Sequence, residues 1–177
     1  MTRIQPLDPS AATGHTKELL DAVKAKLGVV PNMMRTMAHA PAVLESYLGF
    51  SGALGKGVLS LKTREAIALA IGQANRCQYC VSAHTLLGTK AGLNEAAVAA
   101  ARSGESDDAK TAATLRLALA INNRQGHIHD SELSAARAAG LSDAEIMETV
   151  AVVSLNVFTN YVNHVADPQI DFPVVSL

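Results

Sequence analysis

Two cysteines, Cys77 and Cys80, form a C-x-x-C arrangement and are the only cysteines among the 177 residues. His84 follows the second cysteine by four residues, and Glu65 precedes the first by twelve. A thiol beside an imidazole that a carboxylate orients has the composition of an activated nucleophile. A second thiol nearby can condense with the first once the first is oxidised. These four side chains therefore predict thiol redox chemistry.

The residues around the cysteines predict a helical hairpin. Alanine, isoleucine and leucine recur at helical spacing over residues 62–75, and Ser60 is the expected N-cap. We expect a break near Arg76. A second helix then runs from Cys77 to a C-terminal glycine cap at Gly92.

Antiparallel packing of these helices would bring the four side chains together. Glu65 lies 11 residues before a turn at Arg76, and His84 lies 8 residues after it. At a rise of about 1.5 Å per residue, the two positions differ in level by only about 4 Å. Cys80 and His84 are an i, i+4 pair on one helix face, and Cys77 is close enough to Cys80 to bridge. We expect a line of contacts from the carboxylate through the imidazole to the sulfurs, directly or through one water.

The residue pattern leaves two questions open. A helix N-terminus favours a thiolate at Cys77, whereas the imidazole of His84 favours one at Cys80, so the attacking thiol is not decided. The two thiolates with His84 and Glu65 also make up a possible four-coordinate zinc set. Structural zinc sites usually take their ligands from two separate segments, and here three of the four lie on one helix. Redox function is therefore the preferred interpretation.

The same residues resemble a known motif. The pattern E-x11-C-x-x-C-x-x-x-H, with Tyr79 between the cysteines, resembles the core motif of the alkylhydroperoxidase D-like group in the carboxymuconolactone decarboxylase superfamily. The segments 28–50 and 156–173 resemble the flanking segments of its "peroxidase-related" members. The resemblance thus covers the chain from about residue 19 to residue 173.

This resemblance implies a thiol-dependent peroxidase that reduces alkyl hydroperoxides in antioxidant defence. It implies Cys80 as the attacking thiol, Cys77 as the resolving thiol, and Glu65 with His84 as the proton relay. It also implies a homo-oligomer, trimeric or hexameric, and an external dithiol reductant, which is a lipoyl-bearing protein in the best-known relatives. No haem, flavin or metal cofactor is expected. The alternatives are a carboxymuconolactone-type decarboxylase and a non-catalytic thiol sensor or disulfide exchange protein.

The overall composition predicts one all-α domain over residues 1–177. Aromatic residues make up 3% of the chain and tryptophan is absent, which favours closely packed helices over a sandwich or barrel. Residues 1–14 are expected to form an extended arm and residues 167–177 an extended tail. The remaining sequence predicts further helices at residues 15–27, 32–40, 42–54, 95–103, 108–123, 131–139 and 142–166.

Charge and hydropathy exclude several classes of partner. The formal net charge is −1 and the sequence pI is about 6.6, without a basic stripe, which argues against nucleic acid and anionic membranes. The apolar runs are too short to span a bilayer, and the N-terminus lacks the apolar core of a signal peptide. A reactive cysteine pair without a disulfide framework suggests the cytoplasm.

Other polar and sulfur-containing groups have weaker interpretations. His127 and His129 form an H-x-H that could bind metal, but an incidental pair is preferred. Three methionines are expected to be core or substrate-channel residues: Met33, Met34 and Met37. A polar stripe on the last helix faces either a subunit contact or the active site, and the sequence does not decide between them: Asn156, Asn160, Asn163 and His164.

Overall fold

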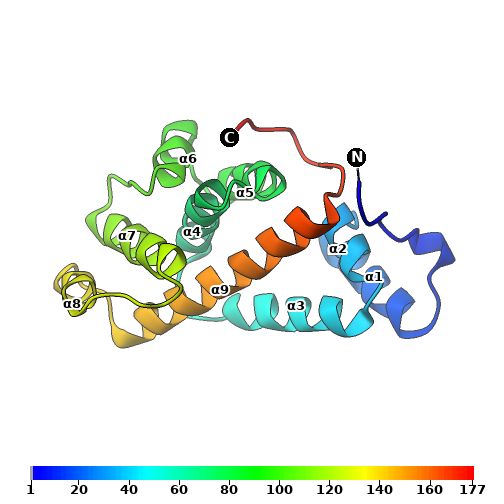
Figure 1. The fold of residues 1–177 in the computed structure, drawn as a ribbon, viewed down its shortest axis with the longest axis horizontal. Coiled ribbons are helices and arrows are strands. Elements are labelled where there is room, and N and C mark those ends of the chain that lie inside the picture. Colours follow the sequence, from blue (N-terminus) through cyan, green and yellow to red (C-terminus); the bar gives the residue numbers. More distant parts are fainter. Residues whose placement is uncertain (1) are drawn as a thin grey trace.

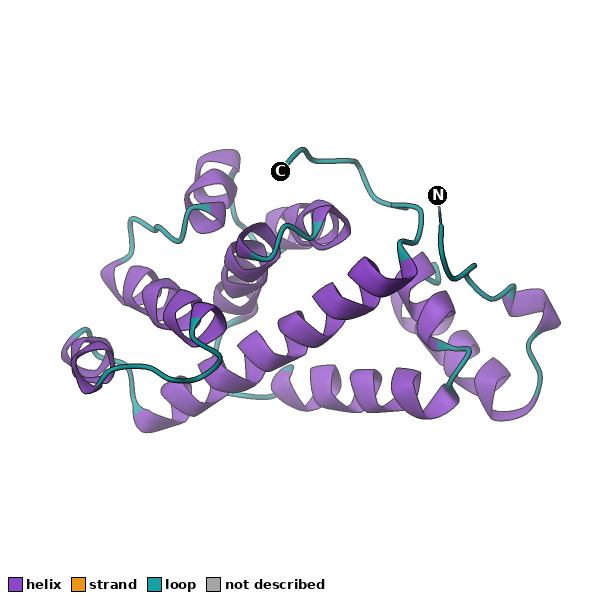
Figure 2. Ribbon diagram, viewed as in Figure 1, coloured by secondary structure: helices purple, strands orange, loops and turns teal. Residues whose placement is uncertain are grey.

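The computed structural model describes residues 2–177, and every regular element in that range is helical, which confirms the predicted all-α class (Figures 1 and 2). A 3-10 turn, Pro9–Ala11, precedes nine α-helices in this part of the chain. The helices are α1 (Gly14–Leu27), α2 (Asn32–Met37), α3 (Pro41–Leu54), α4 (Leu61–Ala74), α5 (Gln78–Lys90), α6 (Glu95–Arg102), α7 (Ala109–Asn123), α8 (Asp130–Ala138) and α9 (Asp143–Ala166).

Helices α4 and α9 organise the fold. Helix α4 packs against α5, α6, α7 and α9, and its residues from Ala66 to Gly72 are all buried. Helix α9 has 24 residues, a length of roughly 36 Å, and runs diagonally beneath α4 and α5 (Figure 1). It also contacts α2, α3 and α7. One face of α9 therefore supports the hairpin that bears the cysteines.

Helices α4 and α5 form the predicted antiparallel hairpin, and two glycines let them approach closely. A Cβ added to Gly72 would lie 3.4 Å from the Cβ of Cys80, near the turn of the hairpin. A Cβ added to Gly88 would lie 3.7 Å from the Cβ of Glu65, at its open end. The chain reverses at Arg76, whose φ of 57° lies in the left-handed region. The predicted break is therefore correct.

Most helix ends follow the predicted caps. The Ser60 hydroxyl accepts a hydrogen bond from the Thr63 amide at the start of α4, and Gly28 ends α1 in the left-handed conformation. Helix α9 begins with a capping box in which Ser142 and Glu145 each accept from the other's backbone amide. Helix α5 also ends at its predicted glycine: Gly92 follows the C-cap Ala91 with a φ of 95°, and the Leu93 amide donates to the Gly88 carbonyl over 2.9 Å.

Apolar side chains form two packed clusters. The larger one joins α4, α6, α7 and α9 around fully buried residues such as Leu69 and Leu115. The smaller one joins the N-terminal helices to the start of α5, and it contains both cysteines. Met33, Met34 and Met37 belong to this second cluster, as a packing role predicted. The cysteines are therefore enclosed by a cluster distinct from the main core.

The terminal segments are less uniform than the sequence suggested. Residue 1 lies outside the described part of the chain, and the remainder of the predicted extended arm contains the 3-10 turn, which Asp8 caps. The tail, residues 167–177, has no regular structure but packs on α5. The Val175 amide donates to the Ser82 hydroxyl over 3.0 Å, and Gln78 donates to the Val175 carbonyl over 3.2 Å. Within residues 2–177, no helix is long and apolar enough to cross a membrane.

Candidate active site

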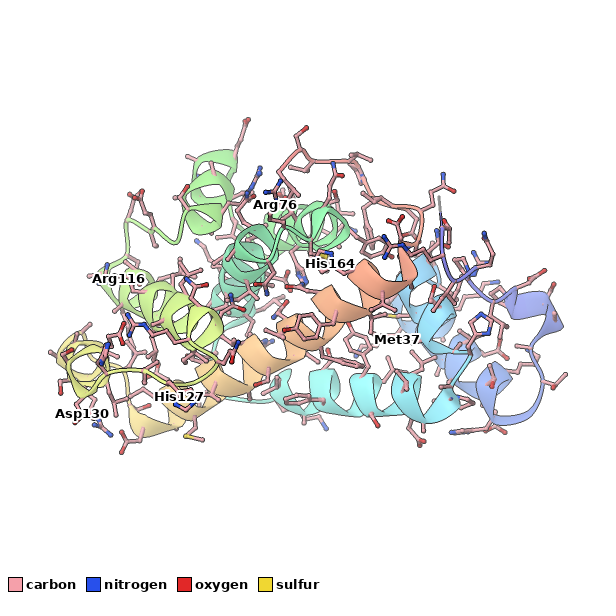
Figure 3. All side chains as sticks on the ribbon, in the orientation of Figure 1. Met37, Arg76, Arg116, His127, Asp130 and His164 are labelled. Atoms are coloured by element: carbon pink, nitrogen blue, oxygen red, sulfur yellow. A yellow bond between two sulfur atoms is a disulfide. The ribbon has the colours of Figure 1, made fainter. Side chains whose placement is uncertain are left out.

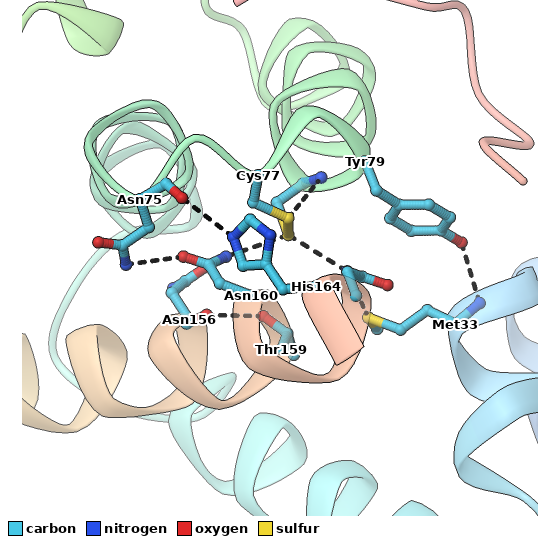
Figure 4. The surroundings of a disulfide bond; sticks show 10 residues. Met33, Asn75, Cys77, Tyr79, Asn156, Thr159, Asn160 and His164 are labelled. Carbon is cyan, nitrogen blue, oxygen red and sulfur yellow. Dashed lines mark hydrogen bonds between the residues drawn. A yellow bond between two sulfur atoms is a disulfide. The ribbon is translucent and has the colours of Figure 1, made fainter. Parts of the chain in front are cut away.

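Cys77 and Cys80 form a disulfide at the start of α5 (Figure 4). Cys77 is the N-cap of this helix, and its sulfur accepts a hydrogen bond from the Cys80 amide over 3.3 Å. The exposed fractions of the two residues are only 2% and 3%. The structure thus places both thiols together in a buried position, joined in the oxidised state.

Glu65 and His84 form a hydrogen-bonded pair across the hairpin. The distance from Glu65 Oε2 to His84 Nδ1 is 2.7 Å, and the side chains are 12% and 23% exposed. A carboxylate only accepts, so Nδ1 donates to it and the neutral imidazole keeps its free lone pair on Nε2. Glu65 also lies beyond the first turn of α4, which removes a simple helix-dipole role. The pair has the geometry of an oriented general base.

The expected line of contacts is interrupted between the imidazole and the sulfurs. No hydrogen bond in the described part of the chain joins His84 to either cysteine. Instead, Cys80 Sγ accepts from the side-chain amides of Asn160 over 3.0 Å and Asn163 over 3.2 Å (Figure 4). The arrangement is therefore two adjacent pairs, one carboxylate–imidazole and one disulfide, with α9 contributing the polar contacts of the second.

The polar stripe of α9 faces the hairpin. Besides the two amides on Cys80, His164 Nε2 lies 3.0 Å from the Asn75 carbonyl at the hairpin turn. Asn156 donates to the Val152 carbonyl of its own helix over 2.9 Å. Sequence reasoning left the position of this stripe open. It missed Asn75 as a partner because that residue signalled only the end of a helix.

A cavity of about 150 Å³ adjoins the carboxylate–imidazole pair. Its lining includes Glu65 and His84, Tyr47 from α3, and Asn156 and Thr159 from α9. Burial, reinforced by the charge of Glu65, raises the pKa of Tyr47 to about 12, so its hydroxyl stays protonated at neutral pH. A cavity of this volume holds a molecule of about the size of benzene. It suits a small substrate with one polar end.

Tyr79, between the two cysteines, anchors the tail and α2. Its hydroxyl donates to Asp171 Oδ1 over 2.7 Å and accepts from the Met33 amide over 3.1 Å. Burial raises the pKa of Tyr79 far above its usual value, which keeps this donor protonated. Phe172 packs edge-on against the Tyr79 ring at a centroid distance of 5.5 Å. The tail is thereby fixed over the helix that bears the cysteines.

Replacing Tyr79 by phenylalanine should lower the free energy of unfolding by about 1–3 kcal/mol, because the buried Met33 amide loses its partner. Urea unfolding followed by circular dichroism measures the difference. Tyr161→Phe is the matched control, since that side chain is 63% exposed, and its effect should stay within about 0.5 kcal/mol. Equal stability of Tyr79→Phe and wild type would contradict the anchoring role.

The two histidines of the H-x-H motif lie far from this site. His127 stands near α8, at the opposite end of the molecule from Met37 and the N-terminal helices (Figure 3). His129 is the N-cap residue of α8. Across residues 2–177, no group of three or more histidine, cysteine, aspartate or glutamate side chains is arranged to hold a metal ion. The structure therefore gives no support to a metal role for this pair.

Residues 41–120, which contain all four motif residues, match the carboxymuconolactone decarboxylase family model. An uncharacterized protein of Haemophilus influenzae is 48% identical over 45 residues, which is 25% of this chain. That match spans only 40% of the relative's own length.

Several solved structures share the whole fold. An uncharacterized peroxidase-related protein from Silicibacter sp. TM1040 has a TM-score of 0.79 at 21% identity, covering 98% of this chain and 93% of that one. An uncharacterized peroxidase-related protein from Ralstonia eutropha JMP134, described as an alkylhydroperoxidase AhpD core, has a TM-score of 0.79 at 23% identity, covering 99% of this chain and 95% of that one. A cysteine-to-alanine variant of the debrominase Bmp8, in complex with 2,3,4-tribromopyrrole, has a TM-score of 0.80 at 24% identity, covering 97% of this chain and 92% of that one.

The family match and the fold matches agree with the resemblance of the motif. Residues 41–120 thus match the carboxymuconolactone decarboxylase family model, and the chain shares its fold with structures described as peroxidase-related and as an alkylhydroperoxidase AhpD core.

Proposed function

We propose that the protein is a thiol-dependent peroxidase for small alkyl hydroperoxides. The observation that supports this most directly is the buried Cys77–Cys80 disulfide on the same hairpin as the hydrogen-bonded Glu65–His84 pair. When the two cysteines are reduced to a dithiol, they can give two electrons to a peroxide and become the disulfide. An oriented imidazole supplies the proton transfers that peroxide reduction needs.

In the first step, His84 Nε2 takes the proton of the Cys80 thiol, through one water. The thiolate attacks the terminal oxygen of the hydroperoxide, so that an S–O bond forms and the O–O bond breaks. The alkoxide leaves and takes the proton from His84, which gives the alcohol. Glu65 supports both transfers, because its carboxylate stabilises the imidazolium that exists between them. The sulfur is oxidised to a sulfenic acid and the peroxide is reduced.

In the second step, the Cys77 thiolate attacks the sulfur of the Cys80 sulfenic acid. The S–S bond forms and the S–O bond breaks; the leaving hydroxide takes up the proton that the Cys77 thiol lost and departs as water, which yields the disulfide present in this structure. An external dithiol must then return two electrons by thiol–disulfide exchange. Because both cysteines are nearly fully buried, a dithiol on a slender, flexible arm, such as a lipoyl group, suits this access better than a rigid protein surface.

The test of this cycle is stoichiometric. The protein is reduced with dihydrolipoamide, freed of reductant, and mixed with one equivalent of tert-butyl hydroperoxide. We expect loss of two thiols and formation of one tert-butanol per chain, within seconds. Thiol loss no faster than that of a free dithiol at the same concentration would reject the peroxidase proposal.

The comparisons suggest two alternative activities, which can be distinguished from peroxide reduction by the substrate that the protein consumes. The structural similarity to a debrominase suggests 2,3,4-tribromopyrrole as a second electron acceptor for the same dithiol. The family match suggests a carboxymuconolactone, whose decarboxylation would not need the cysteine pair. Activity towards the lactone that survives replacement of both cysteines would identify a decarboxylase instead.

Self-association remains part of the proposal. Apolar side chains on the outer face of α9 are strongly exposed, including Tyr161 at 63% and Val165 at 62%. Such exposure is compatible with the homo-oligomer that the motif resemblance implies. Light scattering coupled to size-exclusion chromatography measures the assembly directly.

A further inference from the structure

Cys80 receives two side-chain hydrogen bonds that Cys77 lacks. The amide nitrogens of Asn160 and Asn163 lie 3.0 Å and 3.2 Å from Cys80 Sγ, and all three residues are buried. The sulfur of Cys77 accepts from a backbone amide only, as the N-cap of α5. The environment of the two sulfurs is therefore asymmetric, and donors from α9 converge on one of them.

A chain of amides fixes the orientation of Asn160. Its Oδ1 accepts from Asn75 Nδ2 over 2.9 Å, so its own nitrogen must point towards the sulfur. Asn75 and Asn122 exchange two hydrogen bonds of 3.0 Å and 2.9 Å, which fixes Asn75 in turn. The donor on Cys80 is thus held by side chains of α7, the hairpin turn and α9.

The hydrogen bonds of the Asn163 side chain do not by themselves explain why an asparagine is buried at this position. Its nitrogen donates to Cys80 Sγ and to Met33 Sδ, both weak acceptors in their neutral forms. Its Oδ1 is buried and has no partner among the residues described. An unsatisfied buried group of this kind calls for an explanation, and a redox role is one of the recognised ones.

We propose that Asn160 and Asn163 form an amide cradle that stabilises the anionic sulfur of Cys80 and thereby selects Cys80 as the attacking thiol. Hydrogen bonds to an ionised acceptor are roughly twice as strong as those between neutral groups, so the cradle favours the thiolate over the thiol. Its role in turnover rests on the proposed peroxidase function, whereas its effect on ionisation does not. Both asparagines are positioning residues that act through the sulfur.

The ionisation of Cys80 also depends on the titratable groups of the elements packed around it. These groups are present in every variant below, so the effect of the amides is measured in the same surroundings. They are His84 and Tyr79 on α5, Glu65 on α4 through its contact with His84, His164 on α9, Arg76 at the hairpin turn, and Asp171 in the tail.

The test measures the thiol pKa in a Cys77→Ser background, where serine retains a good N-cap. Ultraviolet absorbance of the thiolate is recorded against pH, because it does not depend on access to the buried sulfur. Asn163→Leu should raise the pKa of Cys80 by about one to two pH units, a ten- to hundredfold loss of thiolate at lower pH. Asn160→Leu should act in the same direction.

Two controls separate ionisation from general damage. Thr149→Val removes a buried hydroxyl from the same helix, one that donates to the Glu145 carbonyl, and should leave the pKa of Cys80 unchanged. In a Cys80→Ser background, Asn163→Leu should leave the pKa of Cys77 unchanged. Asn163→Leu should also unfold at the same temperature as its parent or higher, because it removes the unpartnered oxygen.

An unchanged Cys80 pKa in both asparagine variants would overturn the cradle, as would an equal rise for Cys77. If Asn160→Leu fails to fold, because Asn75 loses one of its two acceptors, Asn163→Leu alone decides the question. The measurement uses no peroxide. If the asparagine variants raise the pKa of Cys80 but the wild-type protein reduces no hydroperoxide, the proposed function is rejected and the cradle stands.

Discussion

Replacing Cys80 by serine should abolish hydroperoxide reduction, leaving only the uncatalysed background. A serine hydroxyl is not ionised near neutral pH and is not oxidised by peroxide, so no sulfenic acid forms. The substitution removes one buried sulfur and should leave the helices intact, which circular dichroism verifies. The measurement is the disappearance of tert-butyl hydroperoxide under excess dihydrolipoamide.

Cys77→Ser is the matched control, because it alters the other sulfur of the same disulfide. This variant should still react with one equivalent of peroxide and then stop, with a sulfenic acid that dimedone traps and mass spectrometry assigns to Cys80. The reverse pattern, with a trapped sulfenic acid on Cys77 in the Cys80→Ser protein, would contradict the assigned roles.

Replacing Glu65 by glutamine should lower kcat/KM by roughly a hundredfold or more, within the range for loss of general acid–base support. In the wild-type protein, His84 Nδ1 lies 2.7 Å from the Glu65 carboxylate. The neutral amide of the variant no longer stabilises the imidazolium of His84. The defect should shrink as pH rises, because solvent then ionises the Cys80 thiol without help from the imidazole. Steady-state rates across a pH series give both results.

Glu95→Gln is the control for this substitution, since it removes an exposed carboxylate from the first turn of α6. It should leave the rate unchanged at every pH. A Glu65→Gln defect of equal size over the whole pH range would indicate a structural role for the carboxylate instead. Rates equal to wild type would remove Glu65 from the mechanism.

The helices were predictable from the sequence where local signals define them. Ser60 and Ser142 each stand at an N-cap followed by an uninterrupted apolar pattern, and both helices begin where these residues predict. Gly28 ends α1 because it adopts a positive φ that other residues rarely do. Gly92 does the same directly after Ala91, the C-cap residue of α5, so the predicted glycine cap of that helix is confirmed.

The candidate site was predictable only within the hairpin. Glu65 and His84 meet because helical rise fixes their levels once the turn is placed, which needs no knowledge of other elements. The donors on Cys80 come from α9, about 80 residues away in sequence. Asparagines on one helix face show that a stripe is polar, but the partner of that stripe depends on tertiary packing.

The contacts of the tail could not be predicted from the sequence either, because they too depend on tertiary packing. The pairing of Tyr79 with Asp171 joins residues 92 positions apart, and neither residue has a pattern that indicates the other. The 3-10 turn in the N-terminal arm was not predicted, for a different reason. Asp8 and Pro9 do favour a capped turn, but one turn of 3-10 helix produces no periodic apolar pattern.

The most direct test of the account is steady-state reduction of tert-butyl hydroperoxide by the wild-type protein. Dihydrolipoamide serves as the electron donor, kept reduced by lipoamide dehydrogenase and NADH. The account predicts NADH oxidation that depends on both protein and peroxide, saturates with peroxide, and is absent in Cys80→Ser. Wild-type NADH oxidation no faster than that of Cys80→Ser, with a disulfide that dihydrolipoamide reduces normally, would contradict the peroxidase function.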